Sequence, residues 1–275
     1  MSIPLEDNVS DIIGKAQRGL GISDSQLAER AGISAERIRK LRDGDFDDDA
    51  VERLAPVLKL DAISLFKLGA GKWNPEAITE VEGLAQFNTN YGDMTVNAYL
   101  AWDPATREAV AFDTGADCDG MLRRIKQENL RVKLILLTHA HPDHVADLRR
   151  LKKLTGAPVY ISELEEAEEA EGITEGKRFR VGSLEIEARL TSGHSPGGMT
   201  FVVTGLSRPV AIVGDALFAG SMGGGNVSYD DALGNNREKI LTLPDETIVC
   251  PGHGPLTTVE KEKLDNPFFA NRLDA

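Results

Sequence analysis

The five histidines of this 275-residue chain occur in three short segments that also contain glycine, proline or aspartate. Three of them, His139, His141 and His144, lie in THAHPDH, while His194 lies in GHSPGG and His253 in PGHGP. Neutral imidazole is a good ligand for zinc, iron and related divalent ions. Three histidines and an aspartate within six positions serve no packing purpose. This grouping therefore predicts a metal site.

Carboxylates accompany the histidines, with Asp143 inside THAHPDH and Asp215 in IVGDALF. Residues two apart in an extended loop can converge on one ion, so His139 and His141 are candidates for a first cation. Asp143 and His144 lie where the following helix begins and can face a second cation. A lone histidine is more often a surface or core residue, and aspartate after glycine commonly makes a turn. A second ion needs further ligands from elsewhere, which we expect to be His194, Asp215 and His253.

The histidine segments each follow a candidate strand, where loops carry functional groups on a rigid scaffold. The candidate strands are residues 107–113, 132–138, 157–162, 183–190, 199–205, 208–215 and 246–252. Helical patterns between them cover residues 119–129, 143–155, 163–171 and 235–243. Strands that alternate with helices predict an α/β sandwich.

The first 70 residues carry only helical patterns, with capping residues before them and glycines after them. The predicted helices are residues 7–19, 23–31, 34–44, 48–59 and 61–68. The segment GAGKWNPEA has the composition of a linker. We therefore predict a small all-α domain over residues 1–70, a linker over 71–82 and a catalytic α/β domain over 83–275.

The composition indicates a globular protein, with 41% hydrophobic and 27% charged residues. No apolar run is long enough to span a membrane, and the N-terminus lacks the pattern of a signal peptide. The net charge of −13 does not attract nucleic acid or anionic membranes. Two cysteines, Cys118 and Cys250, make no disulfide scaffold. These features predict a cytoplasmic protein without a membrane partner.

The segment HAHPDH has the form H-x-H-x-D-H and resembles the metallo-β-lactamase superfamily. The other motifs follow in the order of that family: FDTG with Asp113 before it, then His194, Asp215 in GDALF and His253 in PGHGP. The resemblance covers roughly residues 85–269. It implies an αββα sandwich with the metal ions at one edge of the paired sheets.

The resemblance also implies a role for each site residue. The first metal would be held by His139, His141 and His194, and the second by Asp143, His144 and His253. Asp215 would bridge the two metals. Asp113 looks like the aspartate that orients metal ligands without binding the metal itself. A turn residue without such a role is an equal alternative for Asp113.

Two divalent cations are the implied cofactors, with zinc first and iron or manganese as alternatives. A water that bridges two cations has a lowered pKa, and the resulting hydroxide attacks a carbonyl carbon. Asp215 would act as the bridging carboxylate of this hydrolase, and Asp143 would assist proton transfer.

The segments GDALFAGSMGG, REKILTLPDETIVCPGHGP and TTVEKEKLDNPFF resemble glyoxalase II-like hydrolases. That subgroup implies a small-molecule substrate and the hydrolysis of a thioester such as a hydroxyacyl-glutathione. Its full-length members add a C-terminal helical domain with basic glutathione contacts, for which too few residues follow His253. Lactonases and mononuclear-iron persulfide dioxygenases, which share the fold, therefore stay open as alternatives.

Residues 22–44 resemble the helix-turn-helix of phage-repressor-like transcription factors. By that resemblance the third helix would present Ser34, Glu36, Arg37 and Lys40 to the major groove. However, residues 1–70 contain ten basic and thirteen acidic side chains, and the acidic run DGDFDDD follows that helix. Acidic groups there would repel DNA phosphates. We therefore expect residues 1–70 to mediate homodimerisation or to cover the active site. The alternative is that the protein is a DNA-binding regulator whose metal-binding domain acts as a sensor.

Overall fold

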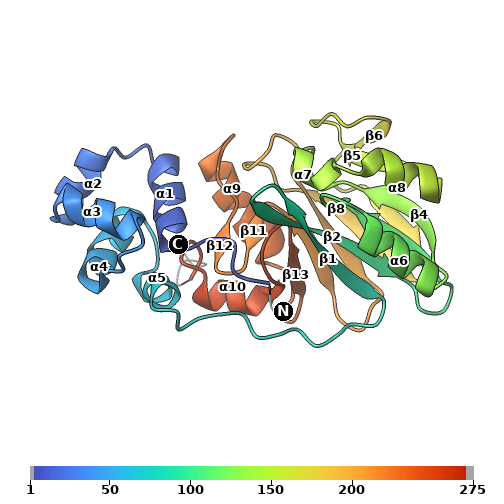
Figure 1. Ribbon diagram of the computed structural model, residues 1–275, viewed down its shortest axis with the longest axis horizontal. Coiled ribbons are helices and arrows are strands. Elements are labelled where there is room, and N and C mark those ends of the chain that lie inside the picture. Colours follow the sequence, from blue (N-terminus) through green and yellow to red (C-terminus); the bar gives the residue numbers. More distant parts are fainter. Residues whose placement is uncertain (1–2, 271–275) are drawn as a thin grey trace.

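Two six-stranded sheets packed face to face form the centre of the computed structural model, which describes residues 3–270 (Figure 1). The first sheet has the order β1 (Leu84–Tyr91), β2 (Met94–Trp102), β3 (Glu108–Phe112), β4 (Arg131–Leu136), β5 (Val159–Ser162) and β6 (Ala170–Ile173). The second sheet has the order β14 (Thr257–Thr258), β13 (Ile248–Pro251), β10 (Val210–Gly214), β9 (Met199–Thr204), β8 (Leu184–Leu190) and β7 (Arg178–Val181). A separate hairpin consists of β11 (Leu217–Phe218) and β12 (Ser221–Met222).

The strands alternate their side chains between two faces, so each sheet buries one face against the other. Phe112 of β3 packs against Phe201 of β9 in this middle layer, with ring centroids 5.7 Å apart. Tyr99 of β2 lies in the same layer, and its hydroxyl donates a hydrogen bond to the Pro251 carbonyl oxygen at 2.6 Å. The two sheets are thus fixed close to the strand end that precedes His253.

Helices cover the outer face of each sheet. On the first sheet α6 (Asp119–Gln127) and α8 (Leu148–Thr155) bury Met121, Leu148 and Leu151. The other outer layer contains α9 (Tyr229–Asn235), the π-helical turn η1 (Asn236–Ile240) and α10 (Val259–Asp265). The chain is therefore an α/β protein with the predicted αββα sandwich. Within residues 3–270, no helix combines the length and the apolar character needed to cross a bilayer.

The five predicted N-terminal helices are present at one end of the molecule (Figure 1). They are α1 (Val9–Gly19), α2 (Asp24–Ala31), α3 (Ala35–Arg42), α4 (Asp48–Val57) and α5 (Ala62–Gly69). Ser23, Ser34 and Asp47 cap α2, α3 and α4 through their side-chain oxygens. Buried residues of these helices and of β9, β10 and β13 belong to one continuous apolar cluster. The N-terminal helices therefore share a core with the outer face of the second sheet.

All seven predicted strands are confirmed, but three helix predictions need correction. The helix predicted over residues 235–243 is the end of α9 followed by η1, and turn residues follow η1. The predicted helix over residues 163–171 is wrong, because this segment forms turns and then enters β6, which pairs with β5. Glutamate and alanine favour a helix locally, but strand pairing and the loop contacts of Glu165 determine the structure here. The helix predicted over residues 143–155 is split into α7 (Pro142–Val145) and α8.

The predicted linker region contains no helix or strand between α5 and β1. It is nevertheless fixed to the protein by Trp73, which is buried. A Cβ atom on Gly220, which has a positive φ, would lie 2.7 Å from the Trp73 ring, so only glycine allows this approach. The exact domain boundaries stay predictions.

Candidate metal centre

The ends of four strands bring the predicted ligands together. His139 and His141 follow β4, and Asp143 and His144 lie in the first turn of α7. The other ligands come from the second sheet, where His194 follows β8, Asp215 follows β10 and His253 follows β13. Because β10 and β13 are parallel neighbours, their carboxyl ends meet at the same sheet edge. All seven predicted ligands thus lie in one site, whereas their binding of metal stays a prediction.

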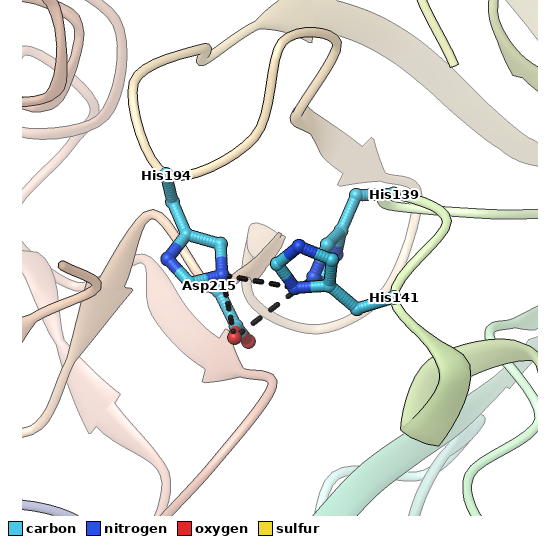
Figure 2. Close-up of side chains that lie close together, drawn as sticks. All are labelled: His139, His141, His194 and Asp215. Atoms are coloured by element: carbon cyan, nitrogen blue, oxygen red, sulfur yellow. Dashed lines mark hydrogen bonds and ion pairs between the residues drawn. The ribbon is translucent and has the colours of Figure 1, made fainter. Parts of the chain in front are cut away.

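A first group of four side chains points to a common centre in Figure 2 and consists of His139, His141, His194 and Asp215. His194 Nε2 lies 3.1 Å from His141 Nδ1 and 3.3 Å from Asp215 Oδ2. His139 Nε2 lies 3.9 Å from the same carboxylate oxygen. A zinc ion lies about 2.0–2.2 Å from its nitrogen and oxygen ligands, so these spacings suit one ion.

A second group consists of Asp143, His144 and His253, and Asp215 lies between the two groups. His253 Nε2 is 3.3 Å from Asp143 Oδ2 and 3.4 Å from Asp215 Oδ2. His144 Nε2 is 3.3 Å from Asp215 Oδ1. The Asp215 carboxylate therefore contacts ligands of both groups, as expected of a bridging residue.

Gly252 makes room for the central carboxylate. A Cβ atom at this position would lie 2.1 Å from Asp215 Oδ1 and 2.7 Å from the His144 ring. Neither neighbour can move away without leaving the ligand cluster. The glycine in PGHGP is thus required by the close approach of β13 and β10.

Hydrogen bonds from outside fix the orientation of the imidazole rings. Asp113 Oδ2 lies 2.8 Å from His144 Nδ1, and the same carboxylate accepts bonds from the Thr138 backbone nitrogen and hydroxyl at 2.7 and 2.8 Å. Asp113 thus contacts a predicted ligand, and its backbone has a left-handed conformation, with φ 55°. His253 Nδ1 lies 2.6 Å from the Thr95 carbonyl oxygen, and His194 Nδ1 lies 3.1 Å from that of Gly224. The outer nitrogens are therefore engaged, and the inner ones face the centre.

Three groups that hold the ligands or their loops in place could not be predicted from the sequence. The carbonyl groups of Thr95 and Gly224 carry no sequence signature, because every residue has one. Glu165 was also missed, although its carboxylate accepts the backbone N–H groups of Ala140 at 3.3 Å and Gly197 at 2.9 Å. It thereby joins the loops of the first group.

Protonated histidines are paired with carboxylates in this cluster. Burial opposes the charge on His144, but the carboxylates of Asp215 and Asp113 outweigh this and raise its pKa to about 10. Burial also opposes the charge on His253, yet the Asp215 carboxylate and a hydrogen bond that His253 donates to Asp143 raise its pKa to about 11. Burial alone would raise the pKa of Asp215, but the neighbouring His144 and His253 hold it well below its usual value. For His139, burial and the charge of His144 outweigh the opposing effect of Asp215 and hold its pKa well below the usual value.

The unpaired atoms of the cluster fit bound cations. Among the described residues, the buried His139 Nε2, His144 Nε2 and Asp215 Oδ1 make no hydrogen bond, and the last two contact each other only as an ion pair at 3.3 Å. An unsatisfied buried polar group costs about 1–3 kcal/mol, so His139 Nε2 needs compensation. Cations bound by imidazole nitrogen and carboxylate oxygen would supply it.

Comparison with known proteins agrees with this geometry. Residues 91–253 match the family model described as the metallo-beta-lactamase superfamily. A relative from Bacillus subtilis named probable metallo-hydrolase YqgX is 32% identical over 204 residues, which span 65% of this chain and 94% of the relative. The hydroxyacylglutathione hydrolase GloC of Haemophilus influenzae is 29% identical over 201 residues, 64% of this chain and 93% of GloC.

A solved structure described as TTHA1623 in a di-iron-bound form superimposes with a TM-score of 0.55 at 29% identity. The alignment covers 66% of this chain and all of that one. The family model spans more than half of the present chain and includes every predicted ligand. The chain therefore belongs to the metallo-beta-lactamase superfamily.

Proposed function

We propose that this chain is a hydrolase that holds two divalent cations and cleaves thioesters of the hydroxyacyl-glutathione type. One observation carries the proposal, namely that Asp215 lies 3.3 Å from His194 in the first group and 3.3 Å from His144 in the second. A carboxylate shared by two histidine groups suits two adjacent cations. The described chain needs no serine or cysteine nucleophile for such chemistry.

Each ligand group would hold one cation. His139, His141 and His194 would bind the first, whereas Asp143, His144 and His253 would bind the second, with Asp215 common to both. Two bound cations would supply a hydroxide near neutral pH and polarise the carbonyl of a substrate.

The remaining chemistry is done by residues of the chain. Asp113 and the Thr95 carbonyl group hold His144 and His253 from outside, so that their inner nitrogens are directed to the centre, where a cation can displace their protons. Asp143 has a slightly exposed side chain, at 12%, against 8% for Asp215. We assign to Asp143 the transfer of a proton between the site and solvent.

The substrate class is supported by the relationship to GloC, which is named for the hydrolysis of hydroxyacylglutathione. At 29% identity this supports a thioester without fixing the acyl group or the thiol. Zinc is the first candidate for the cations, because imidazole and carboxylate ligands suit it. The di-iron form of a related structure supports iron as the alternative.

The N-terminal helices favour a role within the hydrolase over DNA binding. On α3, Arg37 is paired with Asp47 and Asp49, and Lys40 is paired with Glu36. These acidic partners reduce the positive charge that α3 offers to phosphates. We propose that the helical domain is a fixed part of the catalytic unit, and salt-sensitive binding to mixed-sequence DNA would contradict this.

The test is a substrate panel with metal-loaded protein, containing a hydroxyacyl-glutathione thioester, a lactone and a glutathione persulfide. We expect turnover of the thioester that is lost on chelation and returns with added zinc or iron. Turnover of the lactone alone would indicate a lactonase. Oxygen uptake with the persulfide, at one iron per chain, would replace the hydrolase by a dioxygenase.

A further inference from the structure

The segment from β11 to Gly225 supports the metal centre from the side of the N-terminal helices. The ring of Phe218 in β11 stands edge-on to the His253 ring, with centroids 5.7 Å apart. The Gly224 carbonyl group faces His194 Nδ1, and a Cβ atom on Gly223 would lie 1.8 Å from the Asp215 carbonyl oxygen. This segment therefore contacts ligands of both groups, and its position affects their geometry.

Two charged residues from the N-terminal part of the chain hold that segment on its other side. The Asp7 carboxylate accepts hydrogen bonds from the Ser221 hydroxyl and the Lys15 ammonium group. Lys15 Nζ also donates to the Met222 carbonyl oxygen at 2.9 Å and lies 5.0 Å from the centre of the Phe218 ring. The pair thus contacts the hairpin at three of its residues.

Burial makes these contacts specific. The side chains of Asp7 and Lys15 are only 7% and 14% exposed. A buried ion pair contributes little net stability compared with apolar residues of similar volume, but it fixes geometry when its hydrogen bonds are satisfied. Here each charge has partners on the hairpin, so the pair defines where the hairpin lies.

A second ion pair across the same interface provides a comparison. Lys67 of α5 bonds to Asp265 of α10 at 2.8 Å. Within residues 3–270, neither side chain of this pair forms a hydrogen bond to the hairpin or to a predicted metal ligand. It joins the helical domain to the sandwich without touching the metal centre.

We propose that Lys15 and Asp7 are positioning residues of the metal centre. By holding β11 and β12 they keep Phe218 behind His253 and the Gly224 carbonyl group behind His194, and thereby strengthen cation binding. The inference rests on the proposed metal site and extends it. The region matched by the family model begins at residue 91, so these two residues belong to a part of the chain outside that match.

The test measures zinc affinity by competition with a chromophoric chelator, using the full-length chain and zinc alone. Lys15→Met keeps the apolar stem near Phe218 but removes both hydrogen bonds of the ammonium group. We expect its zinc affinity to fall by about 10–100-fold, the range found for outer partners of metal ligands. Lys67→Met should lower the melting temperature and leave zinc affinity within about twofold of wild type.

Lys15→Met leaves the Asp7 charge buried and unpaired, so a second variant separates folding from positioning. Lys15→Met/Asp7→Asn removes that charge and should regain thermal stability while zinc affinity stays low. Zinc affinity equal to wild type in both Lys15 variants would overturn the inference. A wild type with no zinc binding would instead contradict the proposed metal site itself.

Discussion

Two histidines of the site hold protons that a cation must displace. The folded pKa values of His144 and His253 are raised to about 10 and about 11. Below those values each ring is protonated, so metal binding releases protons and becomes tighter as the pH rises. We predict net proton release at pH 7, measured by zinc titration calorimetry in buffers of different ionisation enthalpy. Binding enthalpies that do not depend on the buffer would contradict this.

Asp113 provides a test of ligand orientation. Asp113→Asn keeps the size of the side chain but cannot accept all three hydrogen bonds from His144 and Thr138. We predict about 10–100-fold weaker zinc binding, measured by chelator competition.

Asp103→Asn is the matched control, because Asp103 is another buried aspartate whose carboxylate accepts backbone hydrogen bonds from Ala105 and Ser183, in a separate turn. It should change stability and leave zinc affinity unaltered. Equal losses of zinc affinity in both variants would show that Asp113 acts only through folding.

The residues of the site could be predicted because their motifs are local and their chemistry is unusual. THAHPDH places four potential ligands within six positions, which packing does not require. The partners outside the ligands could not be predicted, since Thr95, Gly224 and Lys15 reach the site only through tertiary structure.

At the scale of elements, prediction succeeded where the local pattern and the tertiary environment agree. The strand over residues 199–205 is almost entirely apolar, and β9 is buried nearly throughout. β1 and β2 were both missed. β1 is polar and none of its residues is fully buried, whereas β2 is buried over most of its length and its apolar pattern was overlooked. The helix predicted over residues 163–171 is an example of disagreement between local pattern and tertiary environment. Its residues favour a helix, but pairing with β5 places the end of the segment in a strand.

Glu262 of α10 links three elements and gives a prediction for stability. Its buried carboxylate accepts hydrogen bonds from Gly220, Asn266 and Thr257. Burial outweighs these bonds and raises its pKa to about 7 from 4.5. The folded state thus binds the proton more tightly than the unfolded state, so this group's contribution is present at low pH and is lost as the pH rises to about 7.

Glu262→Gln removes that titration while keeping acceptors for Gly220 and Asn266 and a donor for the Thr257 hydroxyl. Its free energy of unfolding relative to wild type should rise between about pH 4.5 and 7, by an amount on the order of 3 kcal/mol. Urea unfolding at pH 5 and pH 8 measures this. The same difference at both pH values would contradict the prediction.

At the scale of the whole molecule, the N-terminal helices and the sandwich form one apolar cluster that includes Leu54 of α4 and Val213 of β10. Because this core is shared, the two parts should not unfold independently. We predict a single calorimetric transition for the metal-free full-length chain, with equal calorimetric and van't Hoff enthalpies. Two resolved transitions would show that the helical domain is a separate unit.

The central claim is that Asp215 joins two cation sites within one cluster. The most direct measurement is the metal content per chain by elemental analysis, for the wild type and Asp215→Ala purified in parallel. The account predicts two divalent ions per wild-type chain and a marked loss in Asp215→Ala, with both proteins folded by circular dichroism. One iron per wild-type chain, or an unchanged content in Asp215→Ala, would contradict it.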